Sequence, residues 1–270
     1  MPELPEVESL RRYLIREGIV GRTFDQIVLE DKPSPISGTG AISRIANVKG
    51  RKIKSLERRG KQMVAVLDDG VMGLHMGMTG QLNVLGSNES APRFTRALFT
   101  LTNDLRIALV DPRRWAKLQY FETLNQALKG LGPDALDPDL TGDRFVQSFR
   151  GRTAQIKPLL LNQSIIAGVG NIYADESLHR AKISPDRRAD DIPTDSYKAL
   201  LIAIRESLGH ALSFIQGNLG DRGRPYIVDA HDERMHLIRK PGSFCPRCEI
   251  PLVTQKFSGR TAYFCSNCQK

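Results

Sequence analysis

All four cysteines of the chain lie within its last 26 residues, which constrains the fold there more than any other feature. They form two Cys-x-x-Cys pairs, Cys245–Cys248 and Cys265–Cys268, separated by sixteen residues. Two such turns joined by a hairpin supply the four thiolates of a tetrahedral zinc site. Because four thiolates leave no open coordination position, we predict one structural Zn²⁺ held by Cys245, Cys248, Cys265 and Cys268. Two disulfides are the alternative, which suits a secreted domain better than this chain.

The residues between the cysteine pairs are typical of a β-hairpin. Leu252–Phe257 and Arg260–Phe264 are β-rich runs, and Ser258-Gly259 between them favours a turn. Arg260 is therefore expected just past the hairpin tip. A guanidinium at that place is either a solvated charge or a contact for phosphate.

Composition points to a globular protein with a polyanionic partner. The chain has 270 residues, 40% of them hydrophobic, which suffices for a core and excludes low-complexity disorder. It has 39 Lys and Arg against 30 Asp and Glu, a formal net charge of +9. This surplus favours nucleic acid as the partner, with solubility as the alternative reason for the charge.

No segment predicts a membrane protein. Apolar stretches such as Met63–Leu67 are too short to cross a bilayer. The acidic start, Met1-Pro-Glu-Leu-Pro-Glu-Val-Glu8, is unlike a secretory signal. We therefore expect a soluble, cytoplasmic protein with no membrane partner, associated with the nucleoid if it is bacterial. We also expect a monomer.

The N-terminal half combines one helix with a β-rich region. Leu4–Glu17 has an apolar stripe at helical spacing, and Gly18 ends it. From Thr23 to about Tyr120 short β-rich runs alternate with turns, which favours an antiparallel β-sandwich. The clearest runs are Gln62–Leu67, Gly70–Leu74, Phe94–Thr102 and Leu105–Val110.

The second half reads as helical up to the cysteines. A stretch rich in Gly, Pro and Asp at 129–139 marks a domain boundary. We predict helices from Thr153 to about Asn162, after Asn171, and from Thr194 onward, followed by a glycine-rich loop at 216–224. The overall prediction is an α+β protein with a sandwich domain at 1–131, a helical domain at 132–240 and a zinc finger at 241–270.

The N-terminal segment carries a possible nucleophile. Removal of the initiator methionine would leave Pro2 with a secondary amine, and α-amino groups titrate near about 7.7–8.0, so a useful fraction is neutral. Such an amine can attack an electrophilic sugar carbon and form a cationic iminium. Glu3 beside it could carry protons, and Glu6 lies one turn onward. Met-Pro beginnings without a chemical role are common, and Glu8 is expected only to complement the helix dipole.

Three further segments suit nucleic acid. Seven of the thirteen residues from Lys49 to Lys61 are cationic, and the run leads into an apolar strand that would hold Lys61 at a sheet edge. The other two are His75-Met-Gly-Met78-Thr-Gly80 and Asp111-Pro-Arg113-Arg-Trp115. Taken singly, each of these segments is equally compatible with core packing or a solvated surface.

Together, five ordered segments resemble the bacterial formamidopyrimidine-DNA glycosylase family over nearly the whole chain. They are the N-terminal Met1–Glu8 segment, Arg58-Arg-Gly-Lys61, Asp111-Pro-Arg-Arg114, Gly168-Val-Gly-Asn171-Ile-Tyr-Ala-Asp-Glu176 and Gly259-Arg260. The resemblance implies a bifunctional base-excision enzyme with a helix–two-turn–helix element. It would act on oxidised purines in damaged double-stranded DNA and then cut the strand by β- and δ-elimination.

The resemblance also implies roles for individual side chains. Pro2 would attack C1′ of the damaged nucleotide and Glu3 would move protons, with Glu6 in the base pocket. Phosphate contacts would come from Lys61, Asn171 and Arg260, with His75 and Lys157 as further DNA contacts. Met78, Arg113 and Trp115 would fill the gap left by the everted base, since a base must leave the stack to be cut.

The chain departs from the family pattern at sites linked to specificity. Trp115 replaces a phenylalanine, and Gln216–Pro225 replaces the family's Gly-Gly-Thr-Thr-Leu segment. The resemblance therefore supports the catalytic residues more strongly than it supports a preference for one particular lesion. Three alternatives stay open: the same fold acting on oxidised pyrimidines as in the endonuclease VIII group, a damaged-DNA-binding protein that does not cut, and an RNA-binding role.

Overall fold

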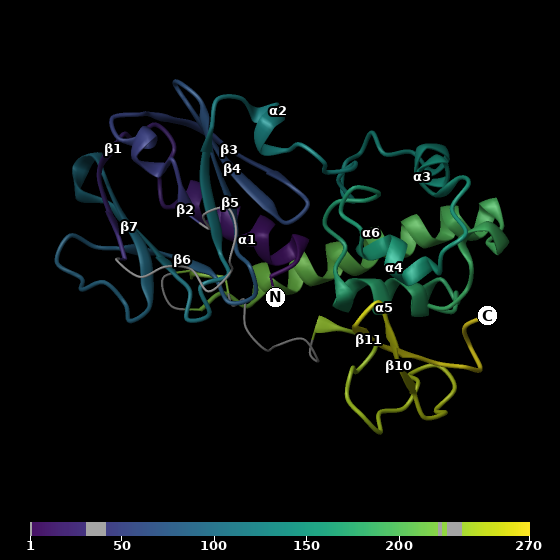
Figure 1. Ribbon diagram of the computed structural model, residues 1–270. Coiled ribbons are helices and arrows are strands. Elements are labelled where there is room, and N and C mark those ends of the chain that lie inside the picture. Colours follow the sequence, from purple (N-terminus) through teal and green to yellow (C-terminus); the bar gives the residue numbers. More distant parts are fainter. Residues whose placement is uncertain (1, 31–41, 221–222, 226–233) are drawn as a thin grey trace. The chain divides into compact units, whose positions relative to one another are not determined.

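The structure is a computed structural model that describes residues 2–30, 42–220, 223–225 and 234–270 (Figure 1). The contacts that residues make in space divide the chain into two compact units. The N-terminal unit comprises Met1–Pro2, Glu6–Lys129 and Gly220–Pro225. The helical unit comprises Glu3–Pro5, Gly130–Leu219 and Tyr226–Lys270, and thus includes the cysteine-rich segment. Each unit is described by itself.

The N-terminal unit is built from two β-sheets (Figure 1). The four-stranded sheet has the order β1 (Phe24–Leu29), β7 (Thr95–Leu101), β8 (Arg106–Val110), β6 (Gln81–Leu85). The five-stranded sheet has the order β2 (Ile42–Ser43), β9 (Lys117–Phe121), β5 (Val71–His75), β4 (Gln62–Leu67), β3 (Ile53–Arg59). All neighbours pair antiparallel except β2 and β9, which pair parallel. The predicted antiparallel sandwich is confirmed, with this one parallel pair as the exception.

Apolar side chains of both sheets meet in one interior. Phe99 and Leu109 face it from the four-stranded sheet, and Met63 and Leu118 face it from the five-stranded sheet. The helix α1 (Leu4–Arg16) adds Leu14 to the same interior. Buried and half-exposed positions therefore alternate along the strands because one face of each sheet packs against this interior, as expected of a sandwich.

Helix α1 follows the pattern predicted from its sequence. Its apolar stripe, Leu4, Val7, Leu10 and Leu14, is almost fully buried. The helix ends at Arg16, one residue before the predicted end, and Gly18 then adopts a positive φ of 73°. The short elements of the N-terminal unit are η1 (Ile45–Val48), η2 (Thr102–Asp104) and α2 (Leu124–Ala127).

The helical unit packs its helices around one apolar core. The elements are α3 (Gly142–Phe149), α4 (Ile156–Leu161), α5 (Asn171–Arg180), η3 (Ala189–Asp191) and α6 (Thr194–Gly217). Figure 1 shows α6 as the long green helix. Phe145, Phe149 and Tyr197 pack their rings together and join α3 to α6.

Two sequence predictions for this unit need correction, and one helix was not predicted. Helix α4 begins at Ile156, not at Thr153, because the chain at 151–155 is exposed and only Ile156 reaches the core. Helix α6 continues through Gly217, so the first residues of the predicted 216–224 loop are helical. Residues 221–222 of that loop lie outside the described residues. Helix α3 was not predicted, although Thr141 accepts a hydrogen bond from the Arg144 N–H as an ordinary N-cap.

The cysteine-rich segment forms the predicted hairpin. Strand β10 (Val253–Phe257) pairs antiparallel with β11 (Arg260–Phe264), and Ser258 and Gly259 turn the chain with positive φ angles of 46° and 76°. Figure 1 shows the two strands below α5. Over the described ranges, no helix has both the length and the apolar character needed to cross a membrane.

Candidate functional site

Glu3 is fixed at the start of helix α5 in the helical unit. Its carboxylate Oε1 accepts a hydrogen bond from the Ile172 N–H at 3.2 Å, and Glu3 is only 2% exposed. The next residue, Leu4, donates its N–H to the Gly168 carbonyl at 3.4 Å. Amide groups at a helix N-terminus attract anions, so this position suits a carboxylate. Pro2, which precedes Glu3, is also buried.

The glycines of the Gly168-Val-Gly170 segment make room for this arrangement. A Cβ on Gly170 would lie 2.1 Å from the carboxyl carbon of Glu3, and a Cβ on Gly168 would lie 2.3 Å from Cδ1 of Leu4. Both distances are far inside van der Waals contact. The segment thus accommodates Glu3 and Leu4 as well as turning the chain toward α5.

Asn171 begins α5 and reaches the hairpin. Its amide Nδ2 donates to the Thr261 carbonyl at 3.1 Å, while Oδ1 is buried and has no hydrogen-bond partner among the described residues. Arg260, the residue before Thr261, is exposed at the start of β11. The predicted phosphate contacts Asn171 and Arg260 are therefore neighbours within the helical unit.

Charged side chains that pair with Asp175 also donate hydrogen bonds to the Thr261 carbonyl. Lys157 Nζ donates to Asp175 Oδ1 at 2.6 Å and to the Thr261 carbonyl at 3.0 Å. Arg239 donates Nε to Asp175 Oδ2 at 2.9 Å and Nη2 to Thr261 at 3.3 Å. The Asp175 carboxylate also accepts the Tyr263 N–H at 3.1 Å, which anchors β11 to α5.

This arrangement corrects the role expected of Lys157. The residue is 0% exposed, and its ammonium is already bound to Asp175 and Thr261. Burial lowers the pKa of Lys157, and the neighbouring Asp175 opposes that shift. A direct contact with DNA does not fit this position. Lys157 instead holds the strand that carries Arg260.

The four cysteines fit a single zinc ion. Their Sγ atoms all lie within 4.8 Å of one another, and the set consists of four soft sulfur donors. Cys245 and Cys265 are buried, while Cys248 and Cys268 are half-buried. Leu237 and Leu252 complete a very small core around them, so the metal would supply much of the stability of this module.

His179 of α5 lies against the cysteine cluster. Its Nε2 is 3.3 Å from Sγ of Cys245, and the side chain is fully buried. Burial, together with the positive charge of Arg247, lowers the pKa of His179 to about 4. With its proton on Nε2, the ring can donate a hydrogen bond to the Cys245 sulfur, as outer partners of metal ligands commonly do.

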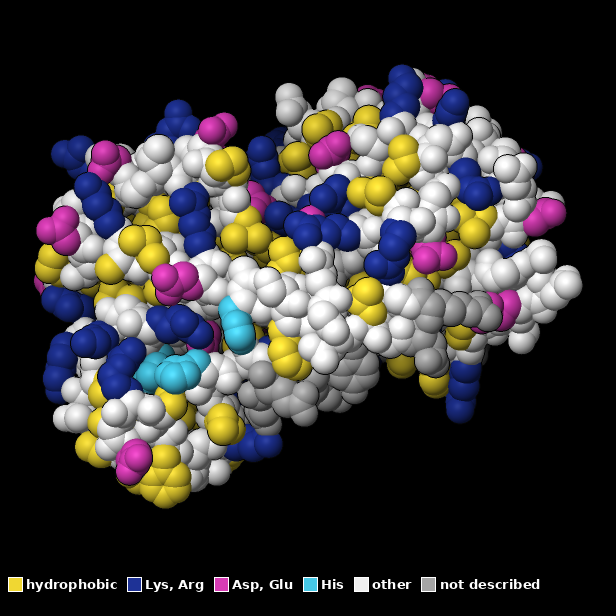
Figure 2. Space-filling view, turned by 180° about the vertical axis from the view of Figure 1, so that it is seen from behind, with side chains coloured by type: hydrophobic (Ala, Val, Ile, Leu, Met, Phe, Trp, Pro, Cys, Tyr) yellow, Lys and Arg dark blue, Asp and Glu magenta, His cyan; other side chains and the backbone are white. Residues whose placement is uncertain are grey.

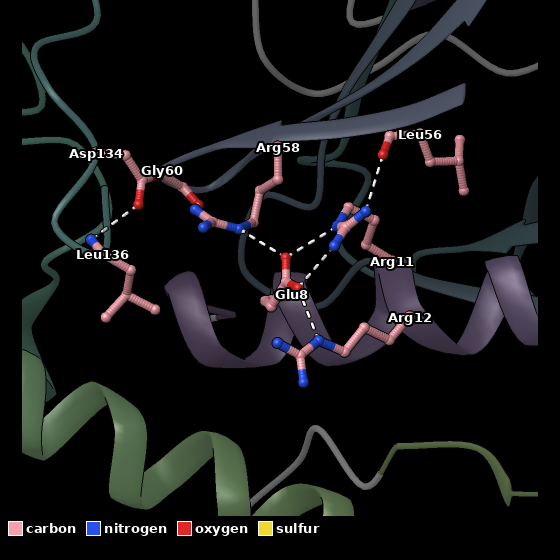
Figure 3. A network of polar contacts seen from close by, with 8 residues as sticks. All are labelled: Glu8, Arg11, Arg12, Leu56, Arg58, Gly60, Asp134 and Leu136. Atoms are coloured by element: carbon pink, nitrogen blue, oxygen red, sulfur yellow. Dashed lines mark hydrogen bonds and ion pairs between the residues drawn. The ribbon is translucent and has the colours of Figure 1, made fainter. Parts of the chain in front are cut away.

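In the N-terminal unit, Glu8 is surrounded by three arginines (Figure 3). Its carboxylate accepts hydrogen bonds from Arg11 at 2.8 and 2.9 Å, from Arg12 at 2.8 Å and from Arg58 at 3.0 Å. Burial raises the pKa of Glu8, but the arginines together outweigh it and bring the pKa down to about 2. The expectation that Glu8 only complements the helix dipole is therefore wrong.

The Glu8 network also fixes the turn that carries Lys61. Arg58 of β3 donates Nη1 to the Gly60 carbonyl at 3.0 Å, and Lys61 follows directly. Lys61 is 8% exposed. One carboxylate on α1 is thus linked through Arg58 to the β3–β4 turn, where the sequence predicted a phosphate contact.

His75 at the end of β5 has a defined protonation state. Its Nδ1 accepts the Gly77 N–H at 3.0 Å, so in the neutral ring the proton is on Nε2. Burial lowers the pKa of His75 to about 4, and the charges of Lys61 and Lys117 add to this shift. His75 can therefore offer a neutral N–H donor near neutral pH.

The three predicted gap-filling residues lie in two connections of the N-terminal unit. Met78 follows β5, while Arg113 and Trp115 follow β8. Met78 and Trp115 are half-buried, and Arg113 is exposed with its guanidinium carbon 4.1 Å from the centre of the Trp115 ring. Such stacking places a planar cation and an aromatic face together. Glu6, the predicted base-pocket residue, is 1% exposed.

Figure 2 shows Lys and Arg side chains across the face seen from behind, with Asp and Glu side chains among them. Sequence reasoning gave Glu8 the wrong role and missed Asp175 and His179. The spacing of Glu8, Arg11 and Arg12 at i, i+3 and i+4 could have indicated the ion pairs of Glu8. Asp175 pairs with Lys157 and Arg239, and His179 contacts Cys245, partners too far along the chain to give a local signal.

Family models match most of the chain. The formamidopyrimidine-DNA glycosylase N-terminal domain matches residues 1–118, and the H2TH domain of the same enzymes matches residues 131–222. The zinc finger found in FPG and IleRS matches residues 242–270. The match to the zinc-finger model agrees with one zinc ion held by the four cysteines.

Full-length relatives and solved structures agree with these matches. The chain is 34% identical to a formamidopyrimidine-DNA glycosylase of Pelotomaculum thermopropionicum, over 100% of this chain and 99% of that protein. It is also 34% identical to one of Stenotrophomonas maltophilia, over 100% of both chains. The fold is similar to that of MutM (Fpg) from Thermus thermophilus, with a TM-score of 0.82, 32% identity and 99% and 98% coverage. A Lactococcus lactis Fpg mutant in complex with Fapy-dG-containing DNA gives a TM-score of 0.84 at 28% identity, with 100% coverage of both chains.

Proposed function

The chain belongs to the formamidopyrimidine-DNA glycosylase family, and from this premise we propose that it is a bifunctional glycosylase and AP lyase for oxidised purines in duplex DNA. The observation that carries the proposal is the placement of Glu3, buried at the N-terminus of α5 and next to Pro2 in the chain. A carboxylate so placed can exchange protons beside an N-terminal amine. The names of the relatives, which specify formamidopyrimidine, support a purine-derived lesion.

The first half of the reaction removes the base. The Pro2 nitrogen attacks C1′ of the damaged nucleotide, and the bond from C1′ to the base breaks with its electron pair leaving on the base. The base gains a proton as it departs. The attacking nitrogen then gives up its proton, and its electron pair expels O4′ as the C1′–O4′ bond breaks and O4′ is protonated. The sugar ring is thereby opened, and an iminium is left between C1′ and the proline nitrogen. Glu3 serves as the proton carrier for these steps.

The second half cuts the strand. Loss of a proton from C2′ sends its electron pair toward the iminium, and the C3′–O bond breaks to release the 3′ phosphate. Loss of a proton from C4′ then allows the C5′–O bond to break in the same way. Lys61, Asn171 and Arg260 would hold the flanking phosphates during both eliminations. A zinc ion would stabilise the hairpin that presents Arg260, without contacting the substrate.

Borohydride reduction tests the covalent step. Protein that begins at Pro2 is incubated with a duplex containing one abasic site, and the iminium is reduced to a stable amine. We expect a cross-linked band whose mass equals protein plus the cleaved DNA product. The matched control carries one extra alanine before Pro2, which converts the proline nitrogen to an amide that cannot form an iminium.

Three outcomes decide the proposal. A band with the Pro2-initiated protein and none with the extended control supports it. No band with either protein removes the lyase and leaves a protein that binds damaged DNA or RNA without cutting. A band with both proteins shows that a primary amine, either a lysine or the α-amino group of the added alanine, can take the place of the proline nitrogen. Met1 lies outside the described residues. Mass spectrometry of the purified chain therefore determines whether Met1 has been removed and the Pro2 nitrogen is free.

Competition between lesions tests the substrate class. The same duplex carries 8-oxoguanine, formamidopyrimidine or thymine glycol, and single-turnover excision rates are compared. We expect the two purine lesions to react faster. Faster excision of thymine glycol would place the specificity with the oxidised pyrimidines instead, a result that Trp115 and the altered 216–225 segment would help to explain.

A further inference from the structure

Two connections of the N-terminal unit are brought together by the strand pairing. Residues 76–80 join β5 to β6, and residues 111–116 join β8 to β9. Both connections cross from one sheet to the other at the same end of the sandwich. The strand register places them together, because His75 pairs with Lys117 in one sheet and Gln81 pairs with Val110 in the other.

A single buried carboxylate bonds to both connections. Asp111 is 0% exposed, and its Oδ1 accepts the hydroxyl of Thr79 from the first connection at 2.5 Å. Within the second connection, Oδ1 accepts the Arg113 N–H at 3.2 Å and Oδ2 accepts the Ala116 N–H at 2.7 Å. The Asp111 N–H donates to the Phe94 carbonyl at 3.0 Å, which ties the group to the chain just before β7.

The backbones of the two connections also touch. Gly77 has a positive φ of 60°, and a Cβ there would lie 2.5 Å from the carbonyl carbon and oxygen of Trp115. The nitrogen of Ala116 would be 2.8 Å away. No side chain fits between the two backbones at this point. Close packing and the Asp111 hydrogen bonds are therefore two separate constraints on the same pair of loops.

We propose that Asp111 is a positioning residue that joins the two connections into one preformed body, so that Met78, Arg113 and Trp115 enter the duplex together. The gap-filling role of those three side chains rests on the proposed function. A wedge whose parts are already fixed loses less conformational freedom on insertion than two independent loops would. Met78 adjoins Thr79, which donates its hydroxyl to Asp111. In the second connection, Arg113 donates its own N–H to Asp111, and Trp115 precedes Ala116, which donates the other N–H.

The chain contains one tryptophan, so Trp115 itself reports the second connection. The decisive variant is on the other connection: Thr79→Val removes the hydroxyl that donates to Asp111 while retaining the shape of the side chain. In the DNA-free protein we expect the acrylamide quenching constant of Trp115 to rise. The loss of one hydrogen bond shifts a local opening equilibrium by about two- to tenfold. Hydrogen exchange at the Ala116 amide should accelerate in parallel.

Two matched variants separate coupling from general loosening. Thr79→Ser retains the hydroxyl and should restore both measurements to their wild-type values. Thr102→Val removes a half-buried hydroxyl that accepts from the Thr23 N–H at 3.2 Å, at the opposite end of β7. That control should leave Trp115 quenching unchanged. Asp111→Asn, which places an amide donor against N–H groups, should exceed the effect of Thr79→Val.

The proposal is overturned if Thr79→Val leaves both Trp115 quenching and Ala116 exchange unchanged in folded protein. It is also overturned if Thr102→Val has the same effect as Thr79→Val. Stopped-flow Trp115 fluorescence with an abasic duplex extends the test: the insertion phase should slow in Thr79→Val. The measurements on free protein require no DNA chemistry, so their failure is distinct from a failure of borohydride trapping.

Discussion

Gly170 is required because a side chain at this position would overlap a neighbour, and not because of its backbone conformation. Its φ of −121° and ψ of −167° are extended values that any residue adopts. The constraint is the Glu3 carboxyl group, which occupies the place where a Cβ would stand. The absence of a side chain at Gly170 therefore determines where the proposed proton carrier lies.

Gly170→Ala should separate activity from stability. The added Cβ meets the end of a flexible side chain, which can rotate away, so we expect only a small change in melting temperature. The Glu3 carboxylate must leave the Ile172 amide, and the single-turnover excision rate should fall by about 10²-fold, the lower range for loss of general acid–base catalysis. Thermal denaturation and excision are measured on the same preparation. Equal rates for the variant and the wild type would contradict the role of Glu3.

At the scale of residues, the sequence named segments for the candidate site but not their contacts. Pro2 and Glu3 were singled out from the N-terminal residues, Asn171 from the resemblance, and the four cysteines from their spacing. Their partners are distant in the chain: Ile172 for Glu3, and Thr261 for Asn171. The same reason explains why Lys157 was predicted to contact DNA. Nothing local to Lys157 indicates that it is buried in an ion pair with Asp175.

Secondary-structure elements with strong local patterns were predicted closely. Strand β4 has the predicted bounds Gln62–Leu67, and the hairpin β10–β11 differs by one residue. The parallel pairing of β2 with β9 was not predicted, because β2 has only two residues and its partner lies more than seventy positions away. The start of α4 was placed too early because Thr153 resembles a cap, whereas burial begins at Ile156.

Glu8 connects two elements, α1 and β3, through opposite charges. Its pKa in the folded protein is about 2, below the ordinary value of 4.5. A depressed carboxylate pKa stabilises the fold above the unfolded-state value and loses that contribution as the pH falls through the folded-state value. The contribution of Glu8 is therefore complete above about pH 4.5 and disappears toward about pH 2.

Glu8→Gln should flatten the stability profile in this window. The free energy of unfolding, measured by urea denaturation between about pH 2 and pH 6, should depend less on pH in the variant than in the wild type. At neutral pH the variant should also be less stable, because three arginines lose a shared counter-charge. Glu17→Gln, just after α1 and outside the network, should preserve the wild-type profile. If the free energy of unfolding became equally less dependent on pH in both variants, the depressed pKa would not belong to Glu8.

At the scale of the whole molecule, the charge of +9 acts through particular side chains rather than as a total. Each phosphate that a cationic side chain neutralises releases counterions and makes binding depend on salt. Arg260 is an exposed guanidinium, so it contributes to that dependence if it contacts phosphate. His75 is neutral above about pH 4, because burial and two lysines oppose its protonation. A contact by His75 therefore adds affinity without releasing counterions.

Arg260→Gln and His75→Ala should consequently weaken DNA binding in different ways. Affinity for a duplex with a stable abasic-site analogue is measured across about 50–200 mM salt. Arg260→Gln should reduce the slope of log K against log salt by about 0.9, the value for one phosphate contact. His75→Ala should lower affinity by a similar factor at every salt concentration, and this factor should be the same at pH 5.5 and pH 8, because the ring stays neutral throughout that range. A reduced slope in His75→Ala, or a factor that grows as the pH falls, would show that the ring carries charge when DNA is bound.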